Sequence, residues 1–227
     1  MRSQRHALLC RLSAPVFSVR YRDSTQVRTG LHRLPKQKGE KMRIILIRHG
    51  LTSGNMEDRY IGSTDEPLCP DGIVALRELS CPDSDIVVCS PMKRCIQTAD
   101  ILYPNAKKVI CKDFRECDFG DFEGRNYREL SGNDYYQKWI DSGGTLSFPN
   151  GESPEDFRSR TVTAFESIVS RYAHCDTLAF VVHGGTIMAV MDRFSFPHRD
   201  YFDWHIKNGE LLTCEFDDSK ITLTEQL

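Results

Sequence analysis

The sequence of 227 residues has no long apolar run and almost no net charge. A helix that spans a membrane needs about 20 consecutive apolar residues, whereas the apolar runs of this chain have the length of strands. We therefore exclude a transmembrane protein and expect no membrane partner. The formal net charge is -2, and the chain beyond residue 41 has no stripe of Lys and Arg, so it lacks the clustered cations that duplex binding requires. We expect no nucleic-acid partner.

The nine cysteines include no C-x-x-C pair. An odd number without paired spacing fits neither a disulfide framework nor a zinc ribbon. A metal site that joins His174 and Cys175 to Cys111 and Cys117 is an alternative, but it lacks the spacing of zinc ligands. We interpret the cysteines as reduced, mostly small core residues, and we expect a cytoplasmic protein.

Positive charge is concentrated at the start of the chain. Residues 1–41 hold ten Lys and Arg against Asp23 and Glu40, whereas residues 42–227 hold 20 basic and 30 acidic side chains. The basic segment has no apolar stretch long enough for a secretory signal. It is open to three interpretations: a transit peptide, a tail that binds nucleic acid or a membrane surface, or an upstream extension outside the functional protein. We favour the extension, expect it to be poorly ordered, and place a single domain at residues 42–227.

Beyond Met42, apolar strand patterns alternate with helical patterns. The predicted strands are residues 43–47, 85–89, 109–111 and 177–182. The predicted helices are residues 71–79, 91–102 with Ser90 as the N-cap, 133–141, 154–172 with a Ser153 cap, and a helix that starts near Gly185. Residues 118–151 indicate a loop-rich cover rather than core, and residues 210–216 with 221–224 indicate a closing hairpin. This order predicts an α/β fold, a three-layer sandwich with a largely parallel sheet and an antiparallel edge.

Polar groups follow three of the predicted strands. Arg48 and His49 follow the first strand, Ser90 and Arg94 follow the second, and His183 follows the strand at 177–182. In open α/β sheets, ligands bind beyond the carboxyl ends of the strands, near helix N-termini. Each residue alone is more often structural than catalytic. Their joint placement at three strand ends predicts a functional site.

Two Arg and two His suit a phosphoryl group, whose transfer is catalysed mainly by positioning and by electrostatic stabilisation. The planar guanidinium group of Arg can donate two parallel hydrogen bonds to the oxygens of a phosphoryl group. A neutral imidazole can also be the nucleophile, because its ordinary pKa of about 6.5 leaves much of it neutral near pH 7. Hydrolysis through a phosphorylated His needs an acid that protonates the leaving alcohol and later accepts a proton from water. A carboxyl group can do both.

Ordered sequence blocks run through residues 42–191. They are Arg48-His49-Gly50-Leu51-Thr52 with Asn55, Arg59-Tyr60-Ile61-Gly62, Ser90-Pro91-Met92-Lys93-Arg94, Glu116 with Phe119-Gly120 and Glu123-Gly124, Gly151-Glu152-Ser153, and His183-Gly184-Gly185. This order resembles the histidine phosphatase superfamily, which also contains the cofactor-dependent phosphoglycerate mutases. The resemblance implies a phosphoglycerate mutase-like fold.

The resemblance also implies a role for each matching residue. The catalytic residues would be His49 as the nucleophile that forms a phosphohistidine, Glu116 as the acid and then the base, and His183. The phosphoryl oxygens would be held by His183 together with Arg48, Thr52, Asn55 and Arg94. No metal and no other cofactor is implied.

Further residues of these blocks bear on specificity. The substrate-side candidates are Arg59, Tyr60, Gly62 and Arg125. Leu51 stands where many relatives carry a polar residue, and this departure affects contacts to the substrate rather than the nucleophile. Tyr135, Tyr136 and Trp139 have near-helical spacing, which favours a local apolar face over stacking on a flat base.

The spacing of 67 positions from Glu116 to His183 is short for the lid of the mutases that it resembles. We therefore expect a phosphatase that hydrolyses a small phosphate ester through a phosphohistidine. A cofactor-dependent phosphoglycerate mutase is the alternative, and a non-catalytic phosphate-binding module is a weaker one. Residues 116–125 most resemble bacterial α-ribazole phosphatases of cobalamin biosynthesis, although such blocks also occur in broader phosphatases and in fructose-2,6-bisphosphatase domains. Monomer and homodimer both remain open.

Overall fold

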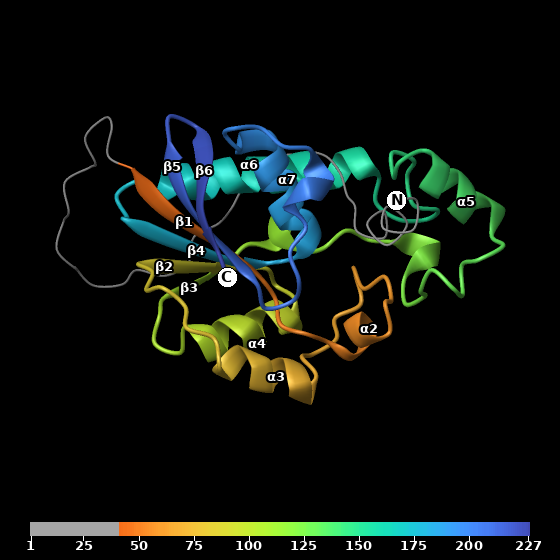
Figure 1. Ribbon diagram of the computed structural model, residues 1–227, viewed down its shortest axis with the longest axis horizontal. Helices are drawn as coiled ribbons and strands as arrows, with labels where there is room; N and C mark the ends of the chain where they lie inside the picture. The colour runs from red at the N-terminus through yellow and green to blue at the C-terminus, as the bar shows by residue number, and fades with distance from the viewer. Residues whose placement is uncertain (1–40) are drawn as a thin grey trace.

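A computed structural model describes residues 41–227 of the chain (Figure 1). Six strands form one sheet in the order β3-β2-β4-β1-β5-β6. The strands are β1 (Met42–Arg48), β2 (Ile86–Cys89), β3 (Lys108–Ile110), β4 (Thr177–Val182), β5 (Leu211–Asp217) and β6 (Lys220–Gln226). The first four are parallel, and β5 pairs antiparallel with both β1 and β6. The predicted largely parallel sheet with an antiparallel edge is confirmed.

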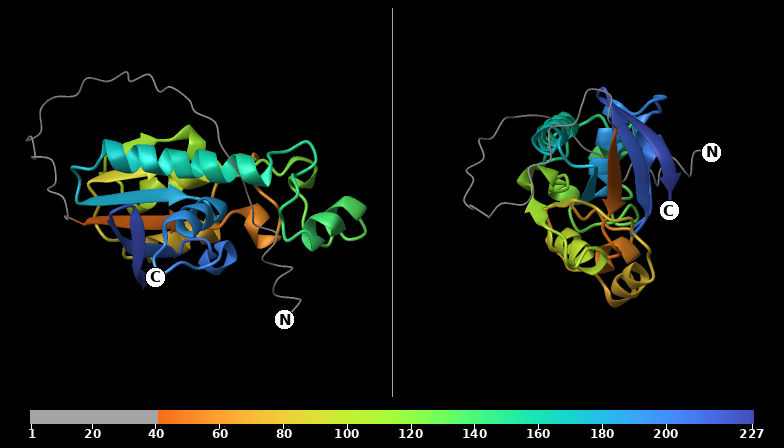
Figure 2. Two further views of the ribbon diagram at one scale, coloured as in Figure 1. Left: turned by 90° about the horizontal axis from the view of Figure 1, so that it is seen from above. Right: turned by 90° about the vertical axis from the view of Figure 1, so that its left-hand side faces the viewer.

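Helices cover both faces of this sheet, as Figures 1 and 2 show. One face carries α6 (Pro154–Arg171) and α7 (Gly184–Phe194), and the other carries α3 (Pro70–Arg77) and α4 (Lys93–Leu102). The three-layer sandwich is therefore confirmed. The remaining short elements are α2 (Ser53–Met56), α5 (Asp134–Asp141), η1 (Lys112–Phe114), η2 (Gly120–Phe122) and η3 (Tyr201–Trp204). Within residues 41–227, none of the helices is both long and apolar enough to cross a membrane.

Alternate residues of the central strands enter two separate cores, because successive side chains of a strand point to opposite faces of the sheet. Ile44 and Leu46 belong to the core that contains Phe165 of α6, whereas Ile45 belongs to the core that contains Ala99 of α4. All six residues of β4 are buried. Burial on both faces is typical of a parallel strand between two helical layers and explains why this strand is an uninterrupted apolar run.

Local sequence signals set most of the helix starts. α6 begins at Pro154, and the Ser153 hydroxyl accepts a hydrogen bond from the backbone N–H of Asp156, as predicted for an N-cap. α4 differs from the prediction, because it begins at Lys93 and Met92 occupies the cap position without a side-chain bond. The Ser90 hydroxyl, which we predicted as the cap, lies within hydrogen-bond distance of the His183 ring instead. The Ser90 side chain therefore contacts His183 in the tertiary structure, whereas the local sequence pattern predicted that it would cap α4.

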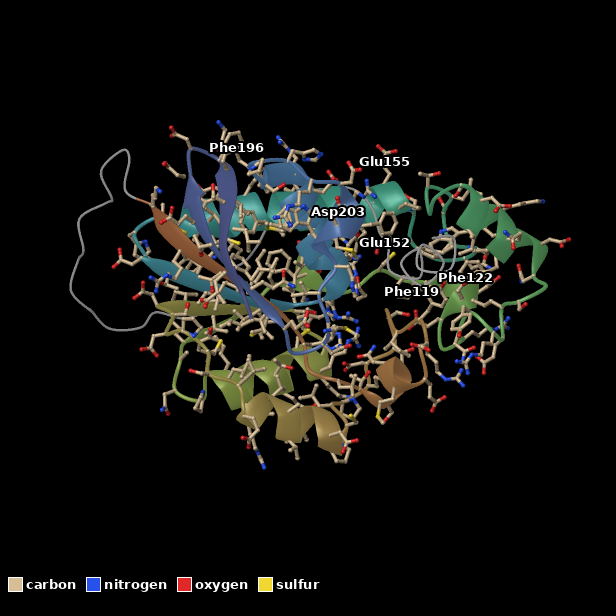
Figure 3. The ribbon with its side chains drawn as sticks, in the orientation of Figure 1. Phe119, Phe122, Glu152, Glu155, Phe196 and Asp203 are labelled. Atoms are coloured by element: carbon tan, nitrogen blue, oxygen red, sulfur yellow. The ribbon has the colours of Figure 1, made fainter. Side chains whose placement is uncertain are left out.

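The prediction that residues 118–151 are cover rather than core is wrong for Phe119, Phe122 and Phe148. The predicted apolar face is confirmed for Tyr136 and Trp139, whereas Tyr135 is 39% exposed. Phe119, Phe122, Tyr136, Trp139 and Phe148 are all at most 6% exposed. The rings of Phe122 and Tyr136 lie 5.4 Å apart, and those of Trp139 and Phe148 lie 5.2 Å apart. Figure 3 shows Phe119 and Phe122 near η2, at the end of the molecule that carries α5. The cover therefore has its own aromatic core, which the polar turns around it conceal in the sequence.

The predicted hairpin at the end of the chain is present as β5 and β6. Asp218 and Ser219 join the two strands with φ angles of 43° and 64°. Positive φ at both central residues is typical of the tight turn that matches the twist of a hairpin. The expectations for the basic N-terminal segment lie, apart from Lys41, outside the described residues.

The aromatic core of the cover gives a stability prediction. Phe122→Ala should lower the free energy of unfolding by about 3–5 kcal/mol, because it removes a fully buried ring from a packed cluster. Urea unfolding followed by tryptophan fluorescence measures the change, since Trp139 lies in the same cluster. Tyr127→Ala is the matched control, because Tyr127 is 41% exposed. Equal effects of the two changes would contradict a core in the cover.

Candidate active site

Three neighbouring parallel strands end at the same edge of the sheet. β2, β4 and β1 are adjacent in that order, and His49 and His183 are the first residues after β1 and β4. Their imidazole rings meet edge to face with centroids 5.2 Å apart. Arg48 is the last residue of β1, and Arg94 lies in the first turn of α4, which follows β2. Both guanidinium charges act on both imidazoles.

His49 is held as a neutral ring. It is 4% exposed, and its Nδ1 lies 2.8 Å from the carbonyl oxygen of Gly50. Because a carbonyl only accepts, Nδ1 carries the proton and Nε2 keeps its lone pair. Burial lowers the pKa of His49 well below its ordinary value, and the charges of Arg94 and Arg48 lower it further. The ring therefore has the protonation state and the tautomer of a nucleophile.

His183 lies at the N-cap position of α7 and is completely buried. Its Nε2 is 2.8 Å from the hydroxyl of Ser90 and 3.6 Å from the thiol of Cys95. Burial again lowers its pKa well below the ordinary value, with Arg94 as the next cause. Burial also raises the pKa of the Cys95 thiol, so this sulfur acts as a small packing group beside the ring.

Arg94 is a fully buried cation, and among the described residues its side chain donates only to backbone carbonyls. Nη1 donates to Thr64 at 2.7 Å, and Nη2 donates to Gly62 at 3.0 Å and to Ile61 at 3.3 Å. Its Nε is buried and has no partner among the described residues. Carbonyls satisfy donors but do not neutralise charge, so the positive charge remains available to an anion.

Arg48 is fixed by a segment that precedes β5. Its Nη1 donates to the carbonyl of Ile206 at 2.8 Å and lies 3.3 Å from Nε2 of His205. The backbone N–H of Gly209 reaches the carbonyls of Arg48 and His49 at 3.1 and 3.2 Å. Residues 205–209 therefore close around the end of β1 and hold the loop that carries His49.

Thr52 and Asn55 form a capping box at the start of α2. The Thr52 hydroxyl accepts from the backbone of Asn55, and Oδ1 of Asn55 accepts from the backbone of Thr52. Oδ1 of Asn55 also accepts from Nδ2 of Asn208 at 2.9 Å. With its oxygen engaged by two donors, Asn55 has its amide N–H groups left for an acceptor such as a phosphoryl oxygen.

Glu116 lies in the loop between η1 and η2, beside the start of α7. A Cβ atom on Gly185 would lie 2.8 Å from Oε1 of Glu116, so the absence of a side chain at 185 makes room for the carboxyl group. Burial raises the pKa of Glu116, although the N–H of Cys117, which donates to Oε1 at 3.0 Å, and the charge of Arg94 oppose the rise. A carboxyl with a raised pKa is suited to donate a proton.

The four substrate-side candidates have partners elsewhere in the protein. Arg59 forms ion pairs with Glu129 and Glu57, which tie the loop after α2 to the cover. The Tyr60 hydroxyl donates to that of Tyr136 in the aromatic core. The Gly62 carbonyl accepts from Arg94, and the Arg125 carbonyl accepts from the backbone of Tyr60. These contacts give packing reasons for the four residues, and their substrate-side role stays a prediction.

Two residues near this site escaped the sequence reasoning. Asn208 contacts Asn55, and Arg160 of α6 contacts the carbonyl of Glu116. Asn208-Gly209 gives only a turn signal, and Arg160 is one polar position on an amphipathic helix. Of the residues placed at the strand ends by sequence, the structure does bring Arg48, His49, Arg94 and His183 together.

The described cysteines do not contribute a metal site. None of the eight forms a disulfide bond, and six of them are buried: Cys69, Cys89, Cys95, Cys117, Cys175 and Cys214. Within residues 41–227, no cluster of three or more His, Cys, Asp or Glu side chains has the arrangement of a metal site. The site instead consists of two neutral imidazoles, two guanidinium groups and one carboxyl.

Known proteins share this arrangement of fold and sequence. Residues 44–226 match the model of the histidine phosphatase superfamily, branch 1. The chain is 30% identical to the uncharacterized phosphatase PhoE of Bacillus subtilis over 183 residues, which cover 78% of this chain and 90% of PhoE. It is 28% identical to the adenosylcobalamin/α-ribazole phosphatase of Salmonella typhimurium over 177 residues, which cover 74% of this chain and 87% of that protein. The crystal structure of a putative α-ribazole-5'-P phosphatase from Escherichia coli superposes with a TM-score of 0.72 at 26% identity, covering 81% of this chain and 94% of that one.

Two guanidinium groups and a neutral imidazole at the ends of parallel strands suit phosphoryl transfer, which is catalysed mainly by positioning and by electrostatic stabilisation. The chain belongs to the histidine phosphatase superfamily. It is a phosphatase that acts on a small phosphate ester through a histidine nucleophile, as the sequence predicted.

The neutral state of His49 gives a pH prediction. In the ligand-free protein, its ring should take up a proton only well below its ordinary pKa of about 6.5, because burial and two cations oppose the charge. The unfolded chain takes up the same proton at the ordinary pKa. Through this group, stability should therefore fall as the pH drops below about 6.5 and be unaffected above it. NMR signals of the ring protons, followed against pH, measure the titration.

His49→Asn identifies the signal by its loss. A His49 signal that titrates at or above the ordinary pKa would contradict the neutral ring, and with it the physical basis for a nucleophile at this position.

Proposed function

We propose that the protein hydrolyses phosphate monoesters without a metal ion, through a phosphohistidine on Nε2 of His49. The observation that carries this proposal is the neutral His49 ring beside Arg94, a buried cation that donates only to carbonyls among the described residues. The site thus combines an unprotonated nucleophile with positive charge for the oxygens that the nucleophile must approach. Such pre-arranged charge is the main source of catalysis in phosphoryl transfer.

In the first step, the lone pair on Nε2 of His49 attacks phosphorus and forms the N–P bond. The bond from phosphorus to the ester oxygen breaks, and the protonated carboxyl of Glu116 gives its proton to the departing alcohol. Arg48 and Arg94 hold the equatorial oxygens, and Asn55 donates its free amide N–H groups. Thr52 lies beside them at the start of α2.

In the second step, water attacks the phosphohistidine. Glu116, now a carboxylate, accepts a proton from this water, the N–P bond breaks, and inorganic phosphate leaves with His49 restored to its neutral form. His183 is neutral in the empty site, because burial and Arg94 lower its pKa. A bound phosphoryl group adds negative charge beside it, which raises that pKa and favours a protonated donor.

The substrate that we propose is a small phosphorylated metabolite, with α-ribazole phosphate as the first candidate. Its support is the similarity to adenosylcobalamin/α-ribazole phosphatases in sequence and to a putative α-ribazole-5'-P phosphatase in structure. The same similarities do not favour a phosphoglycerate mutase over a phosphatase. A cytoplasmic location is part of the proposal, because the cysteines resemble those of proteins from reducing compartments.

The proposed function predicts a covalent intermediate. Brief incubation with a radiolabelled phosphate ester, followed by an alkaline quench, should leave label on the protein that is lost in acid, because phosphohistidine is stable in alkali and labile in acid. Inorganic phosphate should be released at the same rate in EDTA. A panel of ribazole phosphate, sugar bisphosphates and phosphoglycerates, assayed by phosphate release, ranks the substrates and separates hydrolysis from mutase isomerisation.

His49→Asn should abolish both label and turnover. His198→Asn is the matched control, because His198 is an exposed histidine. Turnover without acid-labile label in the unmodified protein would contradict a phosphohistidine, and persistent label in His49→Asn would contradict the choice of His49.

A second prediction concerns the proton donor. Glu116→Gln should slow hydrolysis of an alkyl phosphate by about 10²- to 10⁴-fold, the usual contribution of general acid–base catalysis. The first step with p-nitrophenyl phosphate should be nearly unchanged, since nitrophenolate leaves without a proton. With the unmodified protein, phosphorylation by the alkyl ester should fall as the pH rises through the raised pKa of Glu116, and Glu116→Gln should remove this fall.

Rapid-quench measurement of nitrophenolate and of phosphoprotein separates the two steps. Glu155→Gln is the control, because Glu155 is an exposed carboxylate at the N-terminal end of α6 (Figure 3). An equal loss with both esters would mean that Glu116 supports the site without transferring the proton.

A further inference from the structure

The loop that carries Glu116 is held from behind by one buried side chain. Arg160 of α6 is 5% exposed. Its Nη1 donates to the carbonyls of Asp113 and Arg115 at 2.6 and 2.9 Å, and its Nη2 donates to the carbonyl of Glu116 itself at 3.2 Å. The Arg160 guanidinium group thus binds three backbone carbonyls within residues 113–116.

The other side of this guanidinium meets Glu152. Nε of Arg160 donates to Oε1, and Nη2 donates to Oε2, both at 2.7 Å. This is the bidentate arrangement that fixes both side chains. Guanidinium has five N–H donors, and these five contacts give each donor an acceptor. Glu152 is placed in turn by its own N–H, which donates to the carbonyl of Asp118 at 2.9 Å. Figure 3 shows Glu152 at the N-terminal end of α6.

The same helix also limits the space of the Glu116 carboxyl group. Phe157 lies one turn before Arg160, and the Arg160 guanidinium stacks over its ring at 4.7 Å. The Phe157 ring edge and Oε1 of Glu116 are both within 3.1 Å of the position that a Cβ on Gly185 would take. The carboxyl therefore occupies a narrow space between α6 and the start of α7, and its backbone is fixed by α6.

We propose that the Arg160–Glu152 pair is a positioning device for proton transfer: it holds the backbone of Glu116 so that the carboxyl meets the leaving oxygen. Neither side chain touches the phosphoryl group in this proposal. It rests on the proposed function, because it assigns a support to the proton donor of that reaction. This inference extends the proposed function, because it assigns a role to Glu152 of the Gly-Glu-Ser block, which takes no part in the two reaction steps.

A lysine at position 160 is the sharpest test, because it retains the positive charge. Ammonium is a single point with three donors and cannot serve five acceptors in one plane. The three carbonyls would no longer be held together, and a displacement of the carboxyl by about 1 Å is sufficient to cost up to about 10²-fold in rate. The loss should appear only in the step that needs a proton from Glu116.

The experiment compares rates of phosphoprotein formation, by rapid quench, for an alkyl phosphate and for p-nitrophenyl phosphate. Arg160→Lys should slow phosphorylation by the alkyl ester about 10- to 100-fold and leave phosphorylation by the aryl ester within about twofold. In the Glu116→Gln background, Arg160→Lys should have no further effect on the alkyl ester, since two residues that act on one proton transfer are not additive. Glu152→Gln should give the same pattern and provides a second variant if Arg160→Lys folds poorly.

Arg158→Lys is the matched control. Arg158 lies on the same helix, but its guanidinium stacks over Tyr201 at 4.3 Å. It should leave both rates unchanged. Equal losses with both esters in Arg160→Lys, or additive losses in the double variant, would overturn the positioning role while leaving the phosphohistidine intact. Absence of phosphohistidine in the unmodified protein would instead overturn the proposed function and this inference together.

Discussion

The site depends on a positive charge that the protein buries among carbonyl groups. Arg94 is 0% exposed, and the contacts that hold it come from the backbone of residues 61, 62 and 64. A buried charge without an opposite charge is costly, and an anionic ligand offsets that cost when it binds. Burial lowers the pKa of both His49 and His183, and the charge of Arg94 lowers it further. Arg94 therefore prepares the site for an anion and, together with burial, favours a neutral His49.

The direction of the strands explains how distant segments meet around this charge. β1, β4 and β2 are parallel, so the residues after them lie at one edge of the sheet. β5 runs antiparallel to β1, with Leu211 opposite Ile47, so the residues before β5 lie beside the residues after β1. This is why Asn208 contacts Asn55, although 153 positions separate them. The segment before the antiparallel strand β5 thus supports the loop that follows His49.

The sequence predicts the parts of this protein that rest on local signals. Strand ends, the Ser153 cap and the polar groups after the strands follow from periodicity and residue type, and the structure has the strands and the cap where they were expected. Asn208 and Arg160 could not be predicted, because their contacts arise only when β5 and α6 are placed in three dimensions. Part of the aromatic core of the cover was missed for a related reason. Phe119 and Phe148 contact each other from either side of α5 in the sequence and belong to no periodic pattern, whereas the helical spacing of Tyr136 and Trp139 did indicate an apolar face.

Charge also shows why a chain average does not describe a site. Residues 42–227 carry an excess of acidic side chains, yet the carboxyl at the sheet edge, Glu116, is surrounded by Arg48, Arg94 and Arg160. These cations lower its pKa, but burial outweighs them and the net shift is upward. Once a phosphoryl group binds, its charge compensates the nearby cations, and burial then favours the protonated acid still more. In the proposed reaction, the bound ligand therefore favours the protonated form of Glu116 that donates to the alcohol, and loss of that proton leaves the carboxylate that would accept a proton from the attacking water.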